Sequence, residues 1–326
     1  MMAETRLPVE ASACGKVILL GEHAVVYGRP ALAVPVCGLR ARARAEPLPP
    51  GSGCWIEALD TGERLRLSEA PPDHPLAMAV RLALEHLALP EPDLRLVLRS
   101  ELPIASGLGS GAAVSAALVR GIFRWSGQSP DPELVSALVY EVEKRHHGTP
   151  SGIDNTVIAY ERPLRFVRGQ PPVFLSIARP FTLVIADSGI PSPTRETVAT
   201  VRMAWEREPD RYERLFDAIA ALVREAEACL ASGRIEDLGP LLDTNHQLLR
   251  ELGVSSPALD HLTRIAREAG AMGAKLTGGG RGGHLIALVP PEQAEPVARA
   301  LQAAGARATY RTEIPATLSM ESPLRR

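Results

Sequence analysis

The sequence predicts an α+β protein with two domains, and three observations support this prediction. The chain has 326 residues, of which 45% are hydrophobic, and this is more than one compact domain usually needs. Strand-like and helix-like segments are mixed along it without the regular alternation of a doubly wound parallel sheet. Residues 162–180 contain five prolines or glycines among short apolar pieces, so we place the boundary there and expect domains at 1–170 and 171–326.

The first half of the chain is predicted to form a sheet and a group of helices. Proline-containing loops at 46–53 and 69–75 separate the elements. Apolar runs and alternating patterns predict strands at 16–20, 31–36, 39–45, 55–58, 64–67 and 94–99. Amphipathic patterns predict helices at 76–87, 112–125 and 132–145, and Pro132 stands near the start of the last one, where proline is favoured.

The second half is predicted to contain more helix. A strand at 181–187 ends in Asp-Ser-Gly and is followed by a long helical region at 194–232. Further helices are expected at 235–252, 257–269 and 292–304, and further strands at 284–289 and 308–314.

Composition and charge exclude several classes of function. A formal net charge of -2 without a dense basic run argues against a nucleic-acid or anionic-membrane surface as the main partner. Since no apolar run approaches the roughly 18 residues of a membrane span, we expect a cytoplasmic protein with a small-molecule partner. The four cysteines form no CxxC pair, so we expect reduced thiols in packed positions rather than zinc ligands or disulfides.

Lysine is unusually scarce in this chain. Of 36 basic residues only three are lysine, namely Lys16, Lys144 and Lys275, and each lies in or beside a glycine-containing motif. An ammonium is a compact point charge that a guanidinium fork does not replace. Coincidence is the alternative, and we favour a functional role most for Lys16.

A glycine-rich loop follows the predicted strand at 94–99 and leads into a helix. Gly107, Gly109 and Gly111 allow close backbone approach, and the helix start offers unpaired N–H groups to an anion. We therefore predict a phosphate loop formed by Pro103, Ile104, Ala105, Ser106, Gly107, Leu108, Gly109, Ser110, Gly111, Ala112 and Ala113. It has neither the Walker pattern nor the dinucleotide pattern. The alternative is a turn of small residues that packs a helix against a sheet.

A second glycine cluster lies between Lys275 and His284. Gly278, Gly280 and Gly283 match a dinucleotide pattern in spacing, but a strand follows where a helix should begin. Nicotinamide binding is therefore disfavoured. The loop could line a phosphate or a neighbouring backbone, or it could be a tight connection.

A pair of carboxylates flanks the turn-forming segment at 148–152. Glu143 precedes it and Asp154 follows it, so one could meet a metal and the other a substrate hydroxyl, as phosphoryl transfer requires. An Asp in a turn is also a common capping residue. His146 and His147 are adjacent on a helix and point apart, so we expect no zinc site.

These segments together resemble the GHMP kinase superfamily and, within it, the mevalonate kinase family. The resemblance rests on five motifs in the family's order: CGKVILLGEHAVVYG, LPIASGLGSGAAVSAAL, HGTPSGIDN, DTNHQLLRELGVSSPALD and GAMGAKLTGGGRGG. It implies an S5-like N-terminal ATP-binding domain and a ferredoxin-like C-terminal domain. It also implies a homodimer that uses ATP and Mg²⁺ to phosphorylate the 5-hydroxyl of (R)-mevalonate. The alternatives are another small-molecule kinase of the superfamily, or a non-catalytic metabolite-binding homologue.

The resemblance also implies roles for individual residues. Asp154 matches the base that accepts the hydroxyl proton, and Lys16 matches the lysine that steadies it. Glu143 matches the metal ligand. Residues implied to line the substrate pocket are Glu22, His23, Ser151 and, more weakly, Thr194.

Three positions depart from the family pattern. Gly111 stands where relatives have a serine whose hydroxyl binds Mg²⁺, so either Ser110 replaces it or Glu143 with phosphate oxygens and water suffices. Cys14 replaces a proline before Gly-Lys. Arg281 replaces a glycine, and either contacts a phosphate or points to solvent.

Overall fold

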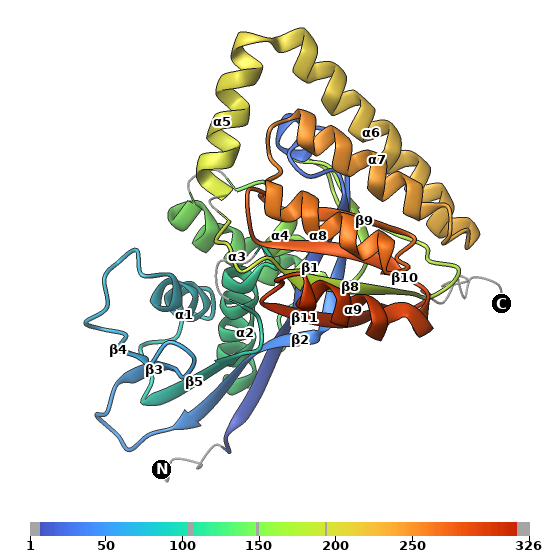
Figure 1. Cartoon of the computed structure of the whole chain (residues 1–326). Helices are drawn as coiled ribbons and strands as arrows, with labels where there is room; N and C mark the ends of the chain where they lie inside the picture. The colour runs from blue at the N-terminus through green and yellow to red at the C-terminus, as the bar shows by residue number, and fades with distance from the viewer. Residues whose placement is uncertain (1–6, 104–106, 148–149, 193, 318–326) are drawn as a thin grey trace, which may run out of the picture. The chain divides into compact units, whose positions relative to one another are not determined.

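The computed structural model describes residues 7–103, 107–147, 150–192 and 194–317 (Figure 1). Packing divides the chain into two compact units, the first made of Met1–Lys16 and Pro35–Glu161, the second of Val17–Val34 and Arg162–Arg326. Strands β1 (Val9–Leu20) and β2 (Ala31–Pro47) contribute residues to both. The predicted boundary at residue 170 between family domains stays a prediction.

In the first unit, a sheet in the order β4-β3-β5-β2 is built from β4 (Glu63–Arg66), β3 (Cys54–Ala58), β5 (Leu94–Ser100) and part of β2, which also pairs with β1. The β2–β5 pair is antiparallel and sets Ala43 opposite Leu98, whereas β3 and β5 run parallel. Alternate residues of β5 are buried, as expected for a strand with one face toward a core.

Four helices of the first unit are α1 (Pro75–His86), α2 (Ser110–Trp125), α3 (Pro132–His147) and α4 (Ile153–Tyr160). Helix α2 contacts the other three and also β5, so it is the central helix of this unit. Its small residues permit this packing: a Cβ on Gly121 would lie 3.6 Å from the Cβ of Ala43 on β2. The helix that carries the predicted phosphate loop is therefore anchored to the sheet along its length.

In the second unit, an antiparallel sheet has the order β11-β8-β10-β9, from β8 (Phe181–Asp187), β9 (Gly273–Thr277), β10 (His284–Val289) and β11 (Ala308–Ile314). Helices α8 (Pro257–Glu268) and α9 (Ala294–Ala303) pack on it, and η2 (Pro291–Gln293) precedes α9. Strands β6 (Leu164–Phe166) and β7 (Val173–Phe174) pair with each other, and β6 pairs with residues 31–33 of β2.

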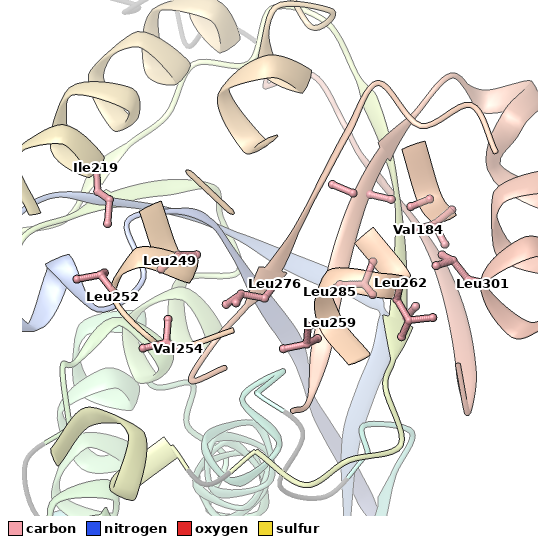
Figure 2. Close-up of a cluster of buried hydrophobic side chains, with 14 of the residues drawn as sticks. Val184, Ile219, Leu249, Leu252, Val254, Leu259, Leu262, Leu276, Leu285 and Leu301 are labelled. Carbon is pink, nitrogen blue, oxygen red and sulfur yellow. The ribbon is translucent and has the colours of Figure 1, made fainter. Parts of the chain in front are cut away.

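The remaining helices of the second unit are η1 (Ala24–Tyr27), α5 (Thr194–Arg207), α6 (Pro209–Ser232) and α7 (Leu238–Glu251). Helix α7 approaches β9 so closely that a Cβ on Gly239 would lie 2.2 Å from the carbonyl oxygen of Met272. Figure 2 shows the buried cluster that joins these helices to the sheet, with Leu249 and Leu259 facing Leu276 and Leu285. Each such side chain contributes about 1.5–3 kcal/mol through burial.

The predicted α+β class is confirmed, and most predicted elements are present within two or three residues of their expected ends. Four details differ. The two strands expected at 31–36 and 39–45 form one long strand, and the strand expected at 16–20 begins at Val9. The helical region at 194–232 breaks before Pro209, and α2 begins at Ser110 rather than at residue 112. Helix α4, strands β6, β7 and β9 and the short helix η1 were not predicted. Among the described helices, none combines the length and apolar character needed to cross a bilayer.

Candidate active site

The centre of the candidate site in the first unit is an ion pair between Lys16 and Asp154. The Lys16 Nζ lies 3.0 Å from Asp154 Oδ1, and it also donates a hydrogen bond to the carbonyl of Gly107 at 3.1 Å. The Lys16 side chain is 3% exposed, whereas that of Asp154 is 34% exposed. Asp154 stands in the first turn of α4, where a negative charge is favoured by the helix dipole. A buried ammonium thus orients a carboxylate that a solute can still reach.

A second carboxylate, Glu143 on α3, belongs to the same electrostatic group. Burial, together with the negative charge of Asp154, raises the pKa of Glu143 to about 7, and the positive charge of Lys16 opposes this shift. Two carboxylates that repel each other at one site are the donors that Mg²⁺ prefers. Because a dication would relieve this repulsion, the donor set fits a metal held by Glu143.

The glycine loop packs directly against this ion pair. The backbone N–H of Lys16 donates to the carbonyl of Leu108 at 3.0 Å. Gly109 has a φ of 75° and precedes α2, and a Cβ there would lie 2.8 Å from Ile158 Cδ1 and 3.2 Å from Lys16 Cγ. Both conformation and space therefore require glycine at this position. The loop and the first N–H groups of α2 lie beside Lys16, as a phosphate cradle needs.

Gly111 faces the second carboxylate. It is exposed in the first turn of α2, and a Cβ on it would lie 3.5 Å from Glu143 Oε1, which is an ordinary contact. A serine at 111 would therefore fit beside Glu143. Glycine at this position removes a hydroxyl that could bind a metal, and steric crowding does not require it. Of the predicted loop, Ile104, Ala105 and Ser106 lie outside the described residues, and Ser110, Ala112 and Ala113 belong to the first turn of α2.

The second unit contains a fully buried ion pair that involves the predicted substrate residue Glu22. Its carboxylate contacts the Nζ of Lys275, and the side chains are 1% and 0% exposed. Lys275 also donates to the carbonyl of Leu276 at 2.6 Å, and Asn245 Nδ2 donates to Glu22 Oε2 at 3.2 Å. Burial raises the pKa of Glu22 and lowers that of Lys275, and their mutual attraction opposes both shifts. The pair fixes Glu22 in the core of this unit.

His23 and Thr194 meet on two sides of Gly279. The His23 Nε2–H donates to the Gly279 carbonyl at 3.0 Å, and burial lowers the pKa of His23 to about 4, so the imidazole is neutral. His23 has a φ of 61°, a strained conformation for a non-glycine residue. A Cβ on Gly279 would lie 2.4 Å from Thr194 Oγ1. Both predicted substrate residues, His23 and Thr194, therefore contact the third glycine motif at Gly279.

The structure therefore sorts the predicted residues into two groups. Ser151 lies in the turn before α4, where its Oγ accepts a hydrogen bond from the N–H of Ile153 at 3.4 Å. The first unit brings together Lys16, Glu143, Ser151, Asp154 and the described part of the glycine loop, and the second unit brings together Glu22, His23 and Thr194.

Two family models match parts of this chain. The model of the GHMP kinases N terminal domain matches residues 75–162, and that of the GHMP kinases C terminal domain matches residues 218–307. A mevalonate kinase of Pyrococcus horikoshii is 39% identical over 319 residues, covering 91% of this chain and 93% of that protein. The chain belongs to the mevalonate kinases of the GHMP kinase family. A mevalonate kinase of Thermococcus sibiricus is 37% identical over 317 residues, with coverage of 91% and 93%.

Solved structures resemble this GHMP kinase over nearly its whole length. The L. major mevalonate kinase in complex with R-mevalonate has a TM-score of 0.85 at 27% identity, covering 98% of this chain and 100% of that one. The Methanococcus jannaschii mevalonate kinase has a TM-score of 0.81 at 24% identity, with coverage of 98% and 100%. The predicted two-domain GHMP kinase fold is confirmed.

Two residues of this GHMP kinase that touch the predicted substrate residues were not assigned to the site from sequence. Lys275 and Asn245 each lie in a motif that carries the family resemblance, but neither was given a role. Their partner Glu22 is more than 200 residues away in the sequence, so only the tertiary fold brings them together. The scarcity of lysine was a further clue for Lys275. Lys144, by contrast, forms a half-exposed pair with Glu141 at 2.6 Å.

Arg281 in the third glycine motif of this GHMP kinase has defined local partners. It has a φ of 58°, and its backbone N–H donates to the carbonyl of Val254 at 2.8 Å. Its guanidinium makes long hydrogen bonds of 3.4 Å to the Gly253 carbonyl and to Thr200 Oγ1. The side chain therefore ties the motif to α5 and to the turn after α7. Contact with a phosphate stays a prediction.

Proposed function

We propose that this GHMP kinase transfers the γ-phosphoryl group of ATP to the 5-hydroxyl of (R)-mevalonate, with Asp154 as the general base. The observation that carries the proposal is the Lys16–Asp154 pair, in which a buried ammonium orients a carboxylate that is one third exposed. The curated relatives at 35–39% identity are named mevalonate kinases, which supports mevalonate as the acceptor.

The proposed chemistry uses the pair as a unit. Asp154 accepts the proton of the substrate hydroxyl, and the hydroxyl oxygen attacks the γ-phosphorus in line as the bond to ADP breaks. Lys16 orients Asp154 through their ion pair and stabilises the negative charge that develops on the attacking oxygen. A lysine suits this place because its ammonium is a point charge with three donors, one of which is already used on Gly107.

The glycine loop and Glu143 serve the nucleotide in this proposal. The N–H groups at the start of α2 and the helix dipole favour phosphate oxygens beside Gly109 and Ser110. Mg²⁺, when bound, neutralises charge on the transferring phosphates. Glu143 would hold the metal, and position 111 would leave room beside it for water or a phosphate oxygen.

The test is Asp154→Asn, which keeps the size of the side chain and removes the base. We expect kcat in an ADP-release assay with mevalonate to fall by about 10²–10⁴-fold, the usual contribution of a general base. ATP affinity, measured by nucleotide fluorescence, should stay nearly unchanged. Asp73→Asn, at an exposed position in the loop before α1, is the matched control and should turn over normally. A variant at 154 that keeps kcat within about tenfold would refute the assigned role.

The acceptor is tested by substrate competition. Mevalonate, phosphomevalonate, homoserine and galactose should be compared at equal concentration, with the product position read by phosphorus NMR. The proposal expects phosphorylation of the 5-hydroxyl of mevalonate, and a clear preference for another alcohol would reject it while leaving the kinase chemistry in place. A homodimer is part of the proposal, and sedimentation at assay concentration would measure it.

A further inference from the structure

Two cysteines on neighbouring strands of the first unit form a close pair. Cys14 on β1 and Cys37 on β2 lie, together with Glu161, so that the two sulfurs and a carboxylate oxygen are within 4.8 Å of one another. Cys14 is fully buried, whereas Cys37 is exposed. The other two cysteines, Cys54 and Cys229, are buried. A pair with one accessible and one protected thiol is the arrangement found in thiol–disulfide exchange.

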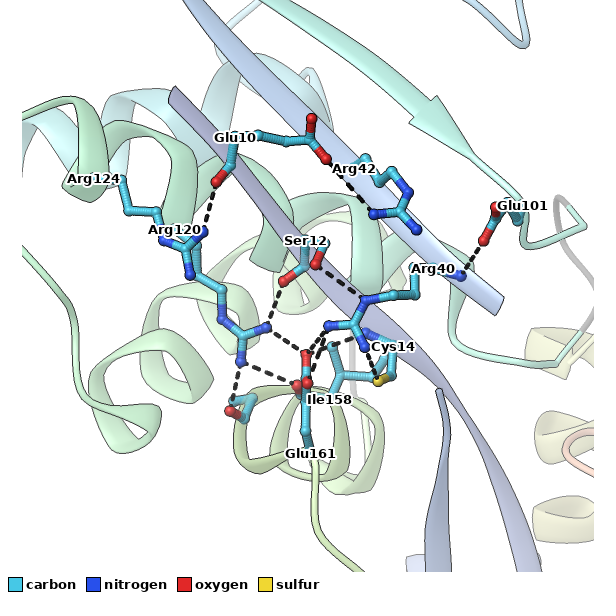
Figure 3. Close-up of polar contacts among 11 residues, drawn as sticks. Glu10, Ser12, Cys14, Arg40, Arg42, Glu101, Arg120, Arg124, Ile158 and Glu161 are labelled. Carbon is cyan, nitrogen blue, oxygen red and sulfur yellow. Dashed lines mark hydrogen bonds and ion pairs between the residues drawn. The ribbon is translucent and has the colours of Figure 1, made fainter. Parts of the chain in front are cut away.

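The charges around the pair argue against a metal ion there. Arg40 Nη1 lies 2.9 Å from Cys14 Sγ, and Arg40 Nη2 lies 3.0 and 3.1 Å from the two oxygens of Glu161. Arg120 adds a second contact to Glu161 at 2.7 Å (Figure 3). Both guanidinium groups occupy the lone pairs that a metal would need, and both would repel it. The cluster fits a stabilised thiolate better than a cation.

The two thiols have opposite tendencies to ionise. A hydrogen bond from the Cys14 S–H lowers the pKa of Cys37, and Arg40 lowers it further, while burial and Glu161 oppose this. The same hydrogen bond, together with burial, raises the pKa of Cys14. The exposed Cys37 is therefore the thiol that ionises more readily, and the buried Cys14 lies beside it. The thiolate is the reactive form of cysteine.

We propose that Cys37 is a thiol-modification site for low-molecular-weight disulfides such as oxidised glutathione, and that Cys14 resolves the adduct to an internal disulfide. The Cys37 thiolate attacks one sulfur of the reagent, forms a mixed disulfide and releases one glutathione thiolate. Cys14 then gives its proton to solvent, attacks Cys37 Sγ and displaces the second glutathione thiolate. The two protein thiols are oxidised and one reagent disulfide is reduced.

The modification should reach the ion pair of the candidate site. A disulfide draws the sulfurs to about 2.05 Å, which must break the contact of Arg40 with Cys14. Cys14 is two residues before Lys16 on β1, and Leu102 packs so closely over Gly15 between them that a Cβ there would lie 2.4 Å from Leu102 Cδ2. Strain at Cys14 is therefore passed to Lys16. This effect on turnover rests on the proposed function, whereas disulfide formation does not.

The experiment incubates the full-length protein with oxidised glutathione, blocks remaining thiols under denaturing conditions and maps disulfides by mass spectrometry. We expect a Cys14–Cys37 cross-link that dithiothreitol reverses. Cys14→Ser should stop at a glutathione adduct on Cys37, and Cys37→Ser, at an exposed position, should not react. Cys54→Ser is the control and should cross-link like the wild type.

Failure to form the cross-link, or adducts mainly on Cys54 or Cys229, would overturn the proposal. Turnover is measured on the same oxidised and reduced samples, and we expect a loss of several-fold that reduction restores. A cross-linked protein with unchanged turnover would overturn the coupling to Lys16. A protein without kinase activity toward any acceptor would count against the proposed function, and the mass readout would still decide the thiol chemistry.

Discussion

Replacing Lys275 with methionine should destabilise the protein by about 3–5 kcal/mol, the cost of leaving a buried charge without its partner. Lys275 is 0% exposed and contacts Glu22, which is 1% exposed and would keep the Asn245 amide at 3.2 Å. Burial already raises the pKa of Glu22 with the ammonium present, so without it Glu22 takes up a proton on folding. The folded state then binds more protons than the unfolded state. The loss should therefore grow as the pH rises, by up to about 1.4 kcal/mol per pH unit.

The assay is urea unfolding followed by circular dichroism across the neutral range, for Lys275→Met, Glu22→Gln and the double variant. The double variant removes both charges, so it should recover most of the loss and show a coupling energy of several kcal/mol. Lys144→Met is the matched control, because its pair with Glu141 is about half exposed, and it should cost less than about 1 kcal/mol. A loss below about 1 kcal/mol in Lys275→Met, or simple additivity in the double variant, would refute the reasoning.

Two more predictions concern the metal site and a buried histidine. Gly111→Ser places a hydroxyl beside Glu143 and should lower the Mg²⁺ concentration needed for half-maximal turnover. Gly111→Ala adds no hydroxyl and should leave that concentration unchanged. Equal Mg²⁺ concentrations for the two variants would contradict the assignment of Glu143 as the metal ligand. Burial lowers the pKa of His246 to about 4. Below about pH 6.5 this histidine therefore binds a proton in the unfolded chain but stays neutral in the folded chain. Stability should therefore fall by about 2 kcal/mol from this group between pH 6.5 and pH 5, and His246→Gln should reduce that loss in urea titrations. An unchanged pH dependence in the variant would exclude His246 as its source.

The geometry around His246 supports the sign of the last prediction. The N–H of Leu276 donates to His246 Nδ1 at 3.3 Å, so this nitrogen is an acceptor and carries no proton. The other nitrogen lies 3.1 Å from Asp260 Oδ1 and 3.2 Å from Thr263 Oγ1. Protonation of Nδ1 would direct its N–H against the backbone N–H of Leu276, and two buried donors would then face each other. The carboxylate of Asp260 favours the charged form, but burial outweighs it.

Local sequence predicted the elements with long periodic patterns and failed where glycine or tertiary packing decides. Helix α4 was missed because its eight residues follow Gly152, which has a φ of 93°, and a short segment after glycines gives little periodicity. Strand β9 was missed because it runs directly into the third glycine motif. Strand β2 continues through Gly38 because its neighbours in the sheet hold it extended, and local propensity does not include those neighbours.

The residues of the candidate site likewise fall into those that the sequence could predict and those that only the fold brings together. Lys16, Glu143 and Asp154 could be named from sequence because glycine motifs mark them, and the structure brings them together. The Glu22–Lys275 pair and the Cys14–Cys37 pair could not be named, because each joins segments that only the fold makes adjacent. Cysteine spacing predicted only reduced thiols, mainly in packed positions, and Cys37 is the exposed exception. Pattern reading thus finds residues beside motifs and misses the partners that control their charge.

The scarcity of lysine has a physical explanation in two of three cases. At Lys16 the stem runs beside Gly109, where a Cβ would come within 3.2 Å of Lys16 Cγ, and the buried ammonium bonds one carboxylate and one carbonyl. At Lys275 the ammonium is enclosed completely and bonds one carboxylate and one carbonyl. Arg40 shows the contrasting need, since its fork bonds Ser12, Cys14 and both oxygens of Glu161 at once. This chain uses lysine where a buried ammonium bonds one carboxylate and one carbonyl, and arginine where several acceptors must be held together.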